Sequence, residues 1–382
     1  MNNLFSFAKI FEINKNFFIF LLLIFITGIF TLYSAAGGNF SPWATKQILY
    51  FIYFLPISVI IILVDINIWY KLSYIIYFGA LLLVIFVEFS GHTAMGATRW
   101  IKVAGGVSLQ PSETMKLALV IGLARYFSGK NIQEIQKNKN IVIPLLMILT
   151  PAVLVLKQPD LGTAFILISI GTAILFLVGV QWWKFVICGI LFVSVLPFAW
   201  KYALHDYQRK RIEVFLNPES DPLGSGYNIT QSKIAIGSGG FLGKGYLKGT
   251  QSQLAFLPEK QTDFIFTTYT EETGFVGGIF IIGLYLMLSA FSFWLAFKSK
   301  YSFGRIIIAG VGFIMFFHVF VNIGMVMGIL PVVGVPLPLF SYGGTITVIS
   351  FLSFSFLLNA DLYKDVEIKN RNLFKLDMPM NL

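Results

Sequence analysis

The chain has 382 residues, of which 57% are hydrophobic and 12% charged, whereas a soluble domain has about 25% charged residues. This composition excludes an ordinary soluble globular protein. The formal net charge is +10, but the basic residues lie between apolar runs. We therefore expect lipid headgroups and anionic, membrane-borne molecules as partners, and no nucleic acid. The single cysteine, Cys188, excludes an intrachain disulfide bond.

Apolar runs of about 20 residues, the length that crosses a hydrocarbon core of about 30 Å, recur along the whole chain. The first run follows Lys9 and Lys15 and imitates a secretory signal peptide, but further runs follow, so we expect an uncleaved first helix. The predicted fold class is an all-α integral membrane protein that forms one polytopic domain over residues 1–382. About ten transmembrane helices are expected, at 17–36, 45–64, 71–89, 111–128, 141–157, 162–180, 184–203, 265–297, 305–328 and 343–360.

The distribution of basic residues predicts the orientation of these helices. With the N-terminus inside, the cytoplasmic connections contain many more Lys and Arg residues than the short outer connections. Both termini are therefore predicted to be cytoplasmic, with a tail over about 361–382. The long polar segment at about 204–264, between the seventh and eighth helices, is then an extracytoplasmic loop and the natural place for chemistry.

The outer loop returns to the membrane through residues 258–263, and an apolar run follows directly. Asp263 lies at the edge of that run, where partial desolvation favours proton uptake and suits a general base. Glu259 and Gln261 are candidate substrate-binding residues beside it. Alternatively, Asp263 is a solvated residue at a helix N-terminus that only stabilises the helix dipole.

A second candidate site lies at the start of the helix predicted from Pro111, where Glu113 follows the proline closely. Glu113 and Lys116 are three residues apart and share one face of the helix. An ion pair at a membrane boundary is costly and usually faces a polar cavity. The alternative is a helix start with a neutralising pair and no further role.

Other candidate residues lie at the predicted outer face. Lys157 and Asp160 flank a tight turn, although its Pro, Asp and Gly residues explain a turn without any function. Arg99, Arg209 and Arg211 could bind phosphate oxygens, because a guanidinium presents a planar fork of donors. The alternative for these arginines is general attraction to anionic lipid.

Three further sequence patterns are weaker indications of a functional site. The glycine-rich segment 237–245 lacks the spacing of a phosphate-binding loop and is interpreted as flexible turns. The histidines show no ligand spacing, so a structural zinc site is not expected. Glu271 and Glu272 follow Asp263 by about two helical turns; one of them either faces the same cavity or lies at the membrane boundary.

Several segments together resemble the SEDS glycosyltransferases, the family that includes RodA, FtsW and SpoVE. The similarity runs in order from about residue 96 to 345 and is carried by 110–113 (QPSE), 158–163 (QPDLGT), 221–228 (DPLGSGYN), 231–240 (QSKIAIGSGG), 256–266 (FLPEKQTDFIF) and 336–344 (PLPLFSYGG). Residues 249–254 (GTQSQL) resemble the elongation branch, RodA, more than the division branch, FtsW. Where the family usually has His, this chain has Gln261, whose amide could keep an orienting hydrogen bond but no proton transfer.

The resemblance implies an inverting glycosyltransferase that polymerises lipid II at the outer face of the bacterial cytoplasmic membrane. The donor would be the growing glycan on undecaprenyl diphosphate, and lipid II would be the acceptor. Asp263 would be the base. Glu113 and Asp160 would orient the cations that meet the diphosphate, for which the candidates are Arg99, Lys116 and Arg211.

The resemblance also implies a partner, a class B penicillin-binding protein whose transpeptidase crosslinks the strands, since no transpeptidase serine motif is present in this chain. No cofactor is certain. A divalent cation, Mg²⁺ or Mn²⁺, could share the charge of the diphosphate, but the sequence shows no dedicated set of ligands. Two other functions stay open: a lipid II flippase or transporter, and a non-catalytic scaffold for wall synthesis, which would give Asp263 no task.

Overall fold

The computed structural model describes residues 12–90, 92–94, 97–103, 107–202, 206–222, 224–254, 256–257 and 259–368. The helices of the membrane region are α1 (Lys15–Ala35), α2 (Trp43–Leu63), α3 (Ile66–Ser90), α4 (Pro111–Phe127), α6 (Lys139–Lys157), α7 (Leu161–Leu177), α8 (Trp182–Tyr202), α12 (Ile265–Lys298), α13 (Ser302–Val326) and α14 (Gly344–Leu362). The remaining elements are α5 (Ile132–Ile135), α9 (Asp206–Leu216), η2 (Pro218–Ser220), α10 (Ser225–Ser238), α11 (Thr250–Gln253), β1 (His92–Ala94), β2 (Ala97–Val103) and β3 (Val107–Leu109).

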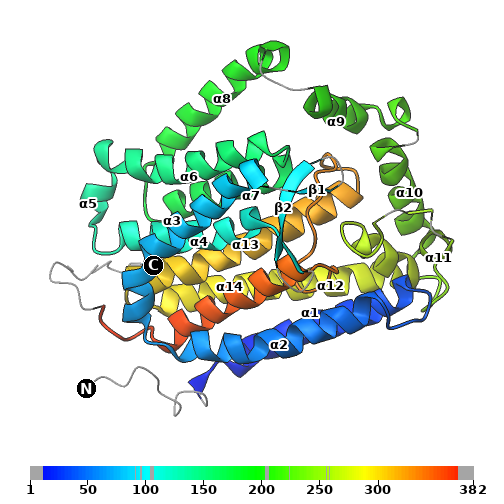
Figure 1. Cartoon of the computed structure of the whole chain (residues 1–382), viewed down its shortest axis with the longest axis horizontal. Helices are drawn as coiled ribbons and strands as arrows, with labels where there is room; N and C mark the ends of the chain where they lie inside the picture. Colours follow the sequence, from blue (N-terminus) through cyan, green and yellow to red (C-terminus); the bar gives the residue numbers. More distant parts are fainter. Residues whose placement is uncertain are drawn as a thin grey trace.

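The long helices form one bundle, with α1 and α2 along one side of it and α6 along the other (Figure 1). Within the described residues, seven helices are long and apolar enough to cross a membrane: α1, α2, α3, α6, α12, α13 and α14. The helix α7 and the first part of α8 are shorter and also apolar. Each predicted span coincides with one of these nine helices or with α4, so the predicted multi-span helical fold is confirmed.

Helix α4 is the least apolar of these helices, because it carries Glu113, Lys116 and Arg125. It packs against α3, α7 and α13, and most of its residues are buried. A charged side chain inside a membrane is tolerated where it faces protein instead of lipid. The central place of α4 therefore explains how its charges fit into the bundle.

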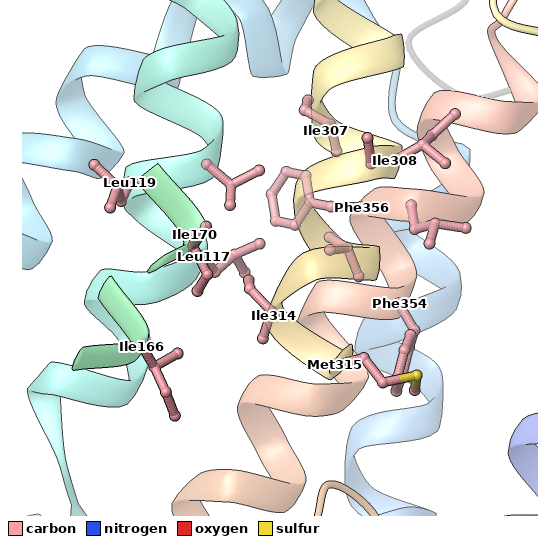
Figure 2. Close-up of a cluster of buried hydrophobic side chains, with 14 of the residues drawn as sticks. Leu117, Leu119, Ile166, Ile170, Ile307, Ile308, Ile314, Met315, Phe354 and Phe356 are labelled. Carbon is pink, nitrogen blue, oxygen red and sulfur yellow. The ribbon is translucent and has the colours of Figure 1, made fainter. Parts of the chain in front are cut away.

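The apolar core extends through the bundle, and one cluster of it lies among α4, α7, α13 and α14 (Figure 2). The side chains that converge there are buried and come from all four helices, among them Leu117, Leu119, Ile166, Ile170, Ile314, Met315, Phe354 and Phe356. Because lipid tails are as apolar as these side chains, the cluster stabilises the bundle through close van der Waals packing. This packing fixes the helices that carry the candidate site residues.

The two ends of the bundle differ in structure. Helix α1 begins and α14 ends at one end, whereas α10 and α11 lie at the opposite end (Figure 1).

The sequence did not predict the three-stranded antiparallel sheet β1-β2-β3 that joins α3 to α4. Arg99 belongs to β2, and its side chain lies outside what the structure describes.

Residues 237–245 end α10 and continue in turns, as the sequence predicted, and main-chain hydrogen bonds tie these turns to α12. Helix α12 is broken at Gly274, which has φ 68° and ψ −163°, and such a break frees main-chain groups that must find other partners. The glycine-rich segment supplies them. Gly240 O accepts from Phe275 N (2.9 Å), and Gly245 N donates to Glu272 O (3.0 Å). A Cβ atom on Gly243 would lie 2.0 Å from Glu272 O, so glycine is required for this close approach.

Candidate functional site

Asp263 lies just before α12, at the end of the bundle that holds α10 and α11, and its side chain is half-buried. Its main-chain carbonyl accepts a hydrogen bond from Nδ2 of Asn322 (2.8 Å). Its carboxylate lies beside Gly334, where an added Cβ atom would be 3.3 Å from Oδ2. Gly334 also has a φ of +71°, a conformation that other residues adopt only with strain. The sequence thus places a glycine where the aspartate needs space.

The residues before Asp263 run along the loop of residues 333–342, which follows α13. The Thr262 carbonyl accepts from Oγ of Ser341 (2.7 Å), and the Gln261 carbonyl accepts from Tyr342 N (2.8 Å). Ser341 Oγ in turn accepts from Leu337 N (2.8 Å). Two of the motif segments, 256–266 and 336–344, are therefore joined by hydrogen bonds to the main chain.

Glu259 forms the turn that leads to Asp263, with a φ of 57°. Its carboxylate accepts from Thr262 Oγ1 (3.0 Å) and, at a long 3.4 Å, from Gln261 Nε2. Its main-chain carbonyl accepts from Thr262 N (3.0 Å) and Phe264 N (3.3 Å). Glu259 and Gln261 are thus placed to shape the loop that carries the aspartate.

Glu113 and Lys116 form the ion pair predicted from their spacing, with Lys116 Nζ 2.6 Å from Glu113 Oε1. Both side chains are buried, and Lys116 is only 1% exposed. The ammonium is also 2.5 Å from Nε2 of His318, and Asp160 adds electrostatic stabilisation to it. In this conformation the Lys116 ammonium is therefore held by protein groups and does not face an open groove.

Asp160 caps the N-terminus of α7, where its carboxylate accepts from Thr163 N (3.2 Å) and from Gln110 Nε2 (3.1 Å). The next turn packs closely on the 333–342 loop, since a Cβ atom on Gly162 would lie 2.8 Å from Val335 Cγ2. The motif segments 110–113 and 158–163 are thus joined by a side-chain hydrogen bond, and the second of them contacts the same loop as Asp263.

The other candidate cations are placed less closely. Lys157 is exposed at the end of α6, and Arg209 and Arg211 are half-buried on α9.

Among the described residues, no group of three or more His, Cys, Asp or Glu side chains could hold a metal ion. The described part of the chain thus offers no set of side-chain ligands for a metal ion.

Glu271 and Glu272 hold the segment that joins α10 to α12. Glu271 accepts from Lys244 Nζ (2.7 Å) and from the main-chain N–H of Ser252 (3.2 Å). Glu272 accepts from the Ser34 hydroxyl on α1. Both carboxylates are buried, and these contacts account for their burial without any contribution to the surroundings of Asp263.

Sequence reasoning missed three residues of this site, His318, Asn322 and Ser341. His318 was considered only as a zinc ligand. A signal was available, because His318 and Asn322 are polar residues four apart within an apolar span, and such residues face the interior of a membrane bundle and mark functional sites.

Comparisons with known proteins identify the family and the fold of the chain. The family described as a cell cycle protein, FtsW/RodA/SpoVE, matches residues 14–365. The Escherichia coli (strain K12) protein named peptidoglycan glycosyltransferase MrdB is 44% identical over 302 residues, which cover 79% of this chain and 80% of that protein.

Two solved structures share the fold. A chain from a structure described as "Structural coordination of polymerization and crosslinking by a peptidoglycan synthase complex" is 31% identical, with a TM-score of 0.79 over 92% of this chain and 99% of that one. The Thermus thermophilus rod shape determining protein RodA is 25% identical, with a TM-score of 0.71 over 93% of this chain and 98% of that one.

The fold and the buried polar site define a multi-pass membrane protein built as a helical bundle. The chain belongs to the FtsW/RodA/SpoVE family, the SEDS family that the sequence motifs indicated.

Proposed function

We propose that this chain polymerises lipid II into glycan strands, with Asp263 as the general base. The general activity is that of its family: the chain is a peptidoglycan glycosyltransferase of the SEDS type. The proposal adds the substrate, the side of the membrane and the residues. The donor is the growing glycan on undecaprenyl diphosphate, and lipid II is the acceptor.

One observation carries the assignment of the base. Asp263 is held at the end of the bundle by Asn322, while its carboxylate lies against the backbone at Gly334. Segments that are far apart in the sequence meet at this point through the 333–342 loop. A general base must be held within hydrogen-bond reach of the proton it removes, and a fixed main chain with a half-buried carboxylate meets that need.

In the proposed reaction a sugar hydroxyl of the acceptor attacks the anomeric carbon of the donor. The new C–O bond forms as the bond from the anomeric carbon to the diphosphate breaks. The hydroxyl proton passes to the carboxylate of Asp263, and the electron pair of the broken bond leaves with the diphosphate. The attack inverts the anomeric carbon, so an α link becomes a β link. A positioned base contributes about 10²–10⁴-fold to such a step.

The departing diphosphate requires positive charge near it. Lys116 would have to leave Glu113 or His318 to reach a substrate, so we assign Lys116, Glu113 and Asp160 to a buried polar layer that supports the site. The diphosphate is assigned to the basic residues of the connecting segments, which are Arg99, Lys157, Arg209 and Arg211.

The proposed orientation puts the end with α10 and α11 outside and both termini in the cytoplasm of a bacterial cell. The positive-inside rule supports it, because the connections at the other end of the bundle are rich in Lys and Arg. For example, Lys298 and Lys300 join α12 to α13 there. Asp263 then meets substrate in the outer leaflet of the cytoplasmic membrane.

The proposed partner is a class B penicillin-binding protein that crosslinks the strands. A solved structure with the same fold is described as a peptidoglycan synthase complex that coordinates polymerization and crosslinking. Similarity to MrdB and to a rod shape determining protein supports a role in cell elongation.

The test incubates the purified protein with labelled lipid II, with and without the partner, and resolves the products by size. We expect a ladder of glycan strands that grows with time. Unchanged lipid II under all conditions would overturn the proposal, and its transfer across a vesicle membrane without polymer would support a flippase instead.

A further inference from the structure

Two polar side chains of α13 contact groups of the candidate site but take no chemical step in the proposed reaction. His318 and Asn322 are four residues apart, so they lie on the same face of the helix. Both are buried inside the bundle. Polar groups in such a place are costly unless each finds hydrogen-bond partners, and the partners of these two lie in the candidate site.

With Lys116 charged, as its ion pair with Glu113 requires, the two contacts of His318 select one protonation state of the ring. Its Nε2 is 2.5 Å from Lys116 Nζ, and its Nδ1 is 3.2 Å from the main-chain oxygen of Pro336. An ammonium can only donate and a carbonyl oxygen can only accept. Nε2 must therefore be the acceptor, and Nδ1 must carry the proton. The ring that satisfies both contacts is neutral imidazole protonated at Nδ1.

Asn322 continues the same line of contacts. Its Nδ2 donates to Asp263 O (2.8 Å) and to Val335 O (2.6 Å). Both partners are carbonyl oxygens, which fixes the orientation of the amide. Val335 and Pro336 are consecutive in the 333–342 loop. Two side chains of α13 therefore bind adjacent carbonyls of this loop, Asn322 that of Val335 and His318 that of Pro336.

We propose that His318 is a positioning residue for glycosyl transfer. Its side chain joins the buried Glu113–Lys116 pair to the 333–342 loop, which contacts Asp263. The connection runs from Lys116 through His318 to Pro336, and from the adjoining Val335 through Asn322 to Asp263. No substrate touches His318, since it is buried. The proposal rests on the proposed function, in which Asp263 is the base.

The first test reads the imidazole directly and needs no substrate. The chain has three histidines, so the purified protein labelled with ¹⁵N-histidine gives few ring signals. The signal that is lost in His318→Asn belongs to the His318 ring. At neutral pH we expect the neutral form protonated at Nδ1. A neutral ring protonated at Nε2, or a charged ring, would overturn the proposal whether or not Asp263 is the base.

The second test uses two amides of similar size. The Nδ2 atom of Asn can occupy the place of Nδ1, so His318→Asn keeps the bond to Pro336. His318→Gln places its amide near Lys116 and loses that bond. A displacement of about 1 Å in a reacting group can cost about 10²-fold in rate. We therefore expect kcat for lipid II polymerisation to fall by about 10–10²-fold in His318→Gln, with KM unchanged, and by much less in His318→Asn.

The two variants also separate this proposal from the proposed function. Equal rates for His318→Asn and His318→Gln, or a change confined to KM, would overturn the positioning role. Full activity of an Asp263→Asn variant would remove the proposed base instead. If either histidine variant fails to fold, variants of the other two histidines identify the His318 ring signal of the otherwise wild-type protein by elimination, and that signal still decides between the two outcomes.

Discussion

The side-chain amide of Asn322 donates a hydrogen bond to the main-chain carbonyl of Asp263, with the two atoms 2.8 Å apart. This bond joins the end of α13 to the start of α12, across 59 residues of sequence. Because the acceptor belongs to the main chain, the contact fixes the backbone position of Asp263 and does not involve its carboxylate.

Removal of this contact should lower the polymerisation activity of the protein that remains folded, in addition to the stability of the fold. Asn322→Ala leaves the carbonyls of Asp263 and Val335 without their donor, and each unsatisfied buried group costs about 1–3 kcal/mol. We expect a lower apparent Tm and a loss of polymerisation of about 10-fold or more, since the base is no longer held in place.

Asn359 provides the matched control, because its buried amide also donates to main-chain carbonyls, those of Ile62 (2.9 Å) and Val64 (2.6 Å). Asn359→Ala should lower the apparent Tm by a similar amount and leave the activity of the folded fraction unchanged. Equal specific activity of the two variants would show that Asn322 only stabilises the fold.

Gly334→Ala tests the space beside the aspartate. The added Cβ atom would lie 3.3 Å from Oδ2 of Asp263, on a residue with a φ of +71°. The backbone strain costs about 1–2 kcal/mol, and the methyl group pushes on the carboxylate. We expect a loss of polymerisation of about 10–10²-fold, measured as strand synthesis from labelled lipid II.

The control for this variant is Gly179→Ala, where φ is +94° and nothing lies within 4 Å of the added atom. It imposes similar strain far from Asp263, so its polymerisation should match that of the wild type after correction for the folded fraction. If Gly334→Ala is as active as Gly179→Ala, the space at Gly334 has no bearing on the carboxylate.

The ion pair of Lys244 with Glu271 should matter far more than the pair of Lys210 with Asp221. The carboxylate of Glu271 is fully buried and lies 2.7 Å from Lys244 Nζ, whereas the Lys210 side chain is 64% exposed. Hydrogen bonds to charged groups contribute about 1.5–3 kcal/mol each, while an exposed pair contributes about 0–1 kcal/mol. Glu271→Ala should therefore unfold at a lower temperature and expose residues 244–252 to limited proteolysis.

Lys210→Ala should leave both the apparent Tm and the proteolysis pattern as in the wild type. Resistance of residues 244–252 to proteolysis in Glu271→Ala would contradict the inference that this buried carboxylate holds the segment in place.

The sequence was informative where the signal is local. Apolar runs of the right length predicted every helix of the bundle. The three-residue spacing predicted the Glu113–Lys116 pair, because residues three apart meet on one face of a helix. The motif around Asp263 was found because a carboxylate stands directly before an apolar run.

The contacts that assemble the site could not be predicted in this way. His318 meets Lys116 across 202 residues, and the packing of whole helices decides such a contact. The docking of the glycine-rich segment on α12 depends on the break at Gly274, which no periodicity reveals. The sheet at residues 92–109 has strands of only three to seven residues, too short for a clear alternating pattern.

The most direct test of the account is the rate of glycan synthesis by purified Asp263→Asn protein, supplied with labelled lipid II and its partner. Asn has nearly the same shape as Asp but cannot accept the hydroxyl proton, and its main-chain carbonyl can still bind Asn322. We predict the wild-type apparent Tm and no detectable polymer. Strand synthesis at the wild-type rate by the folded variant would contradict the assignment of Asp263 as the base.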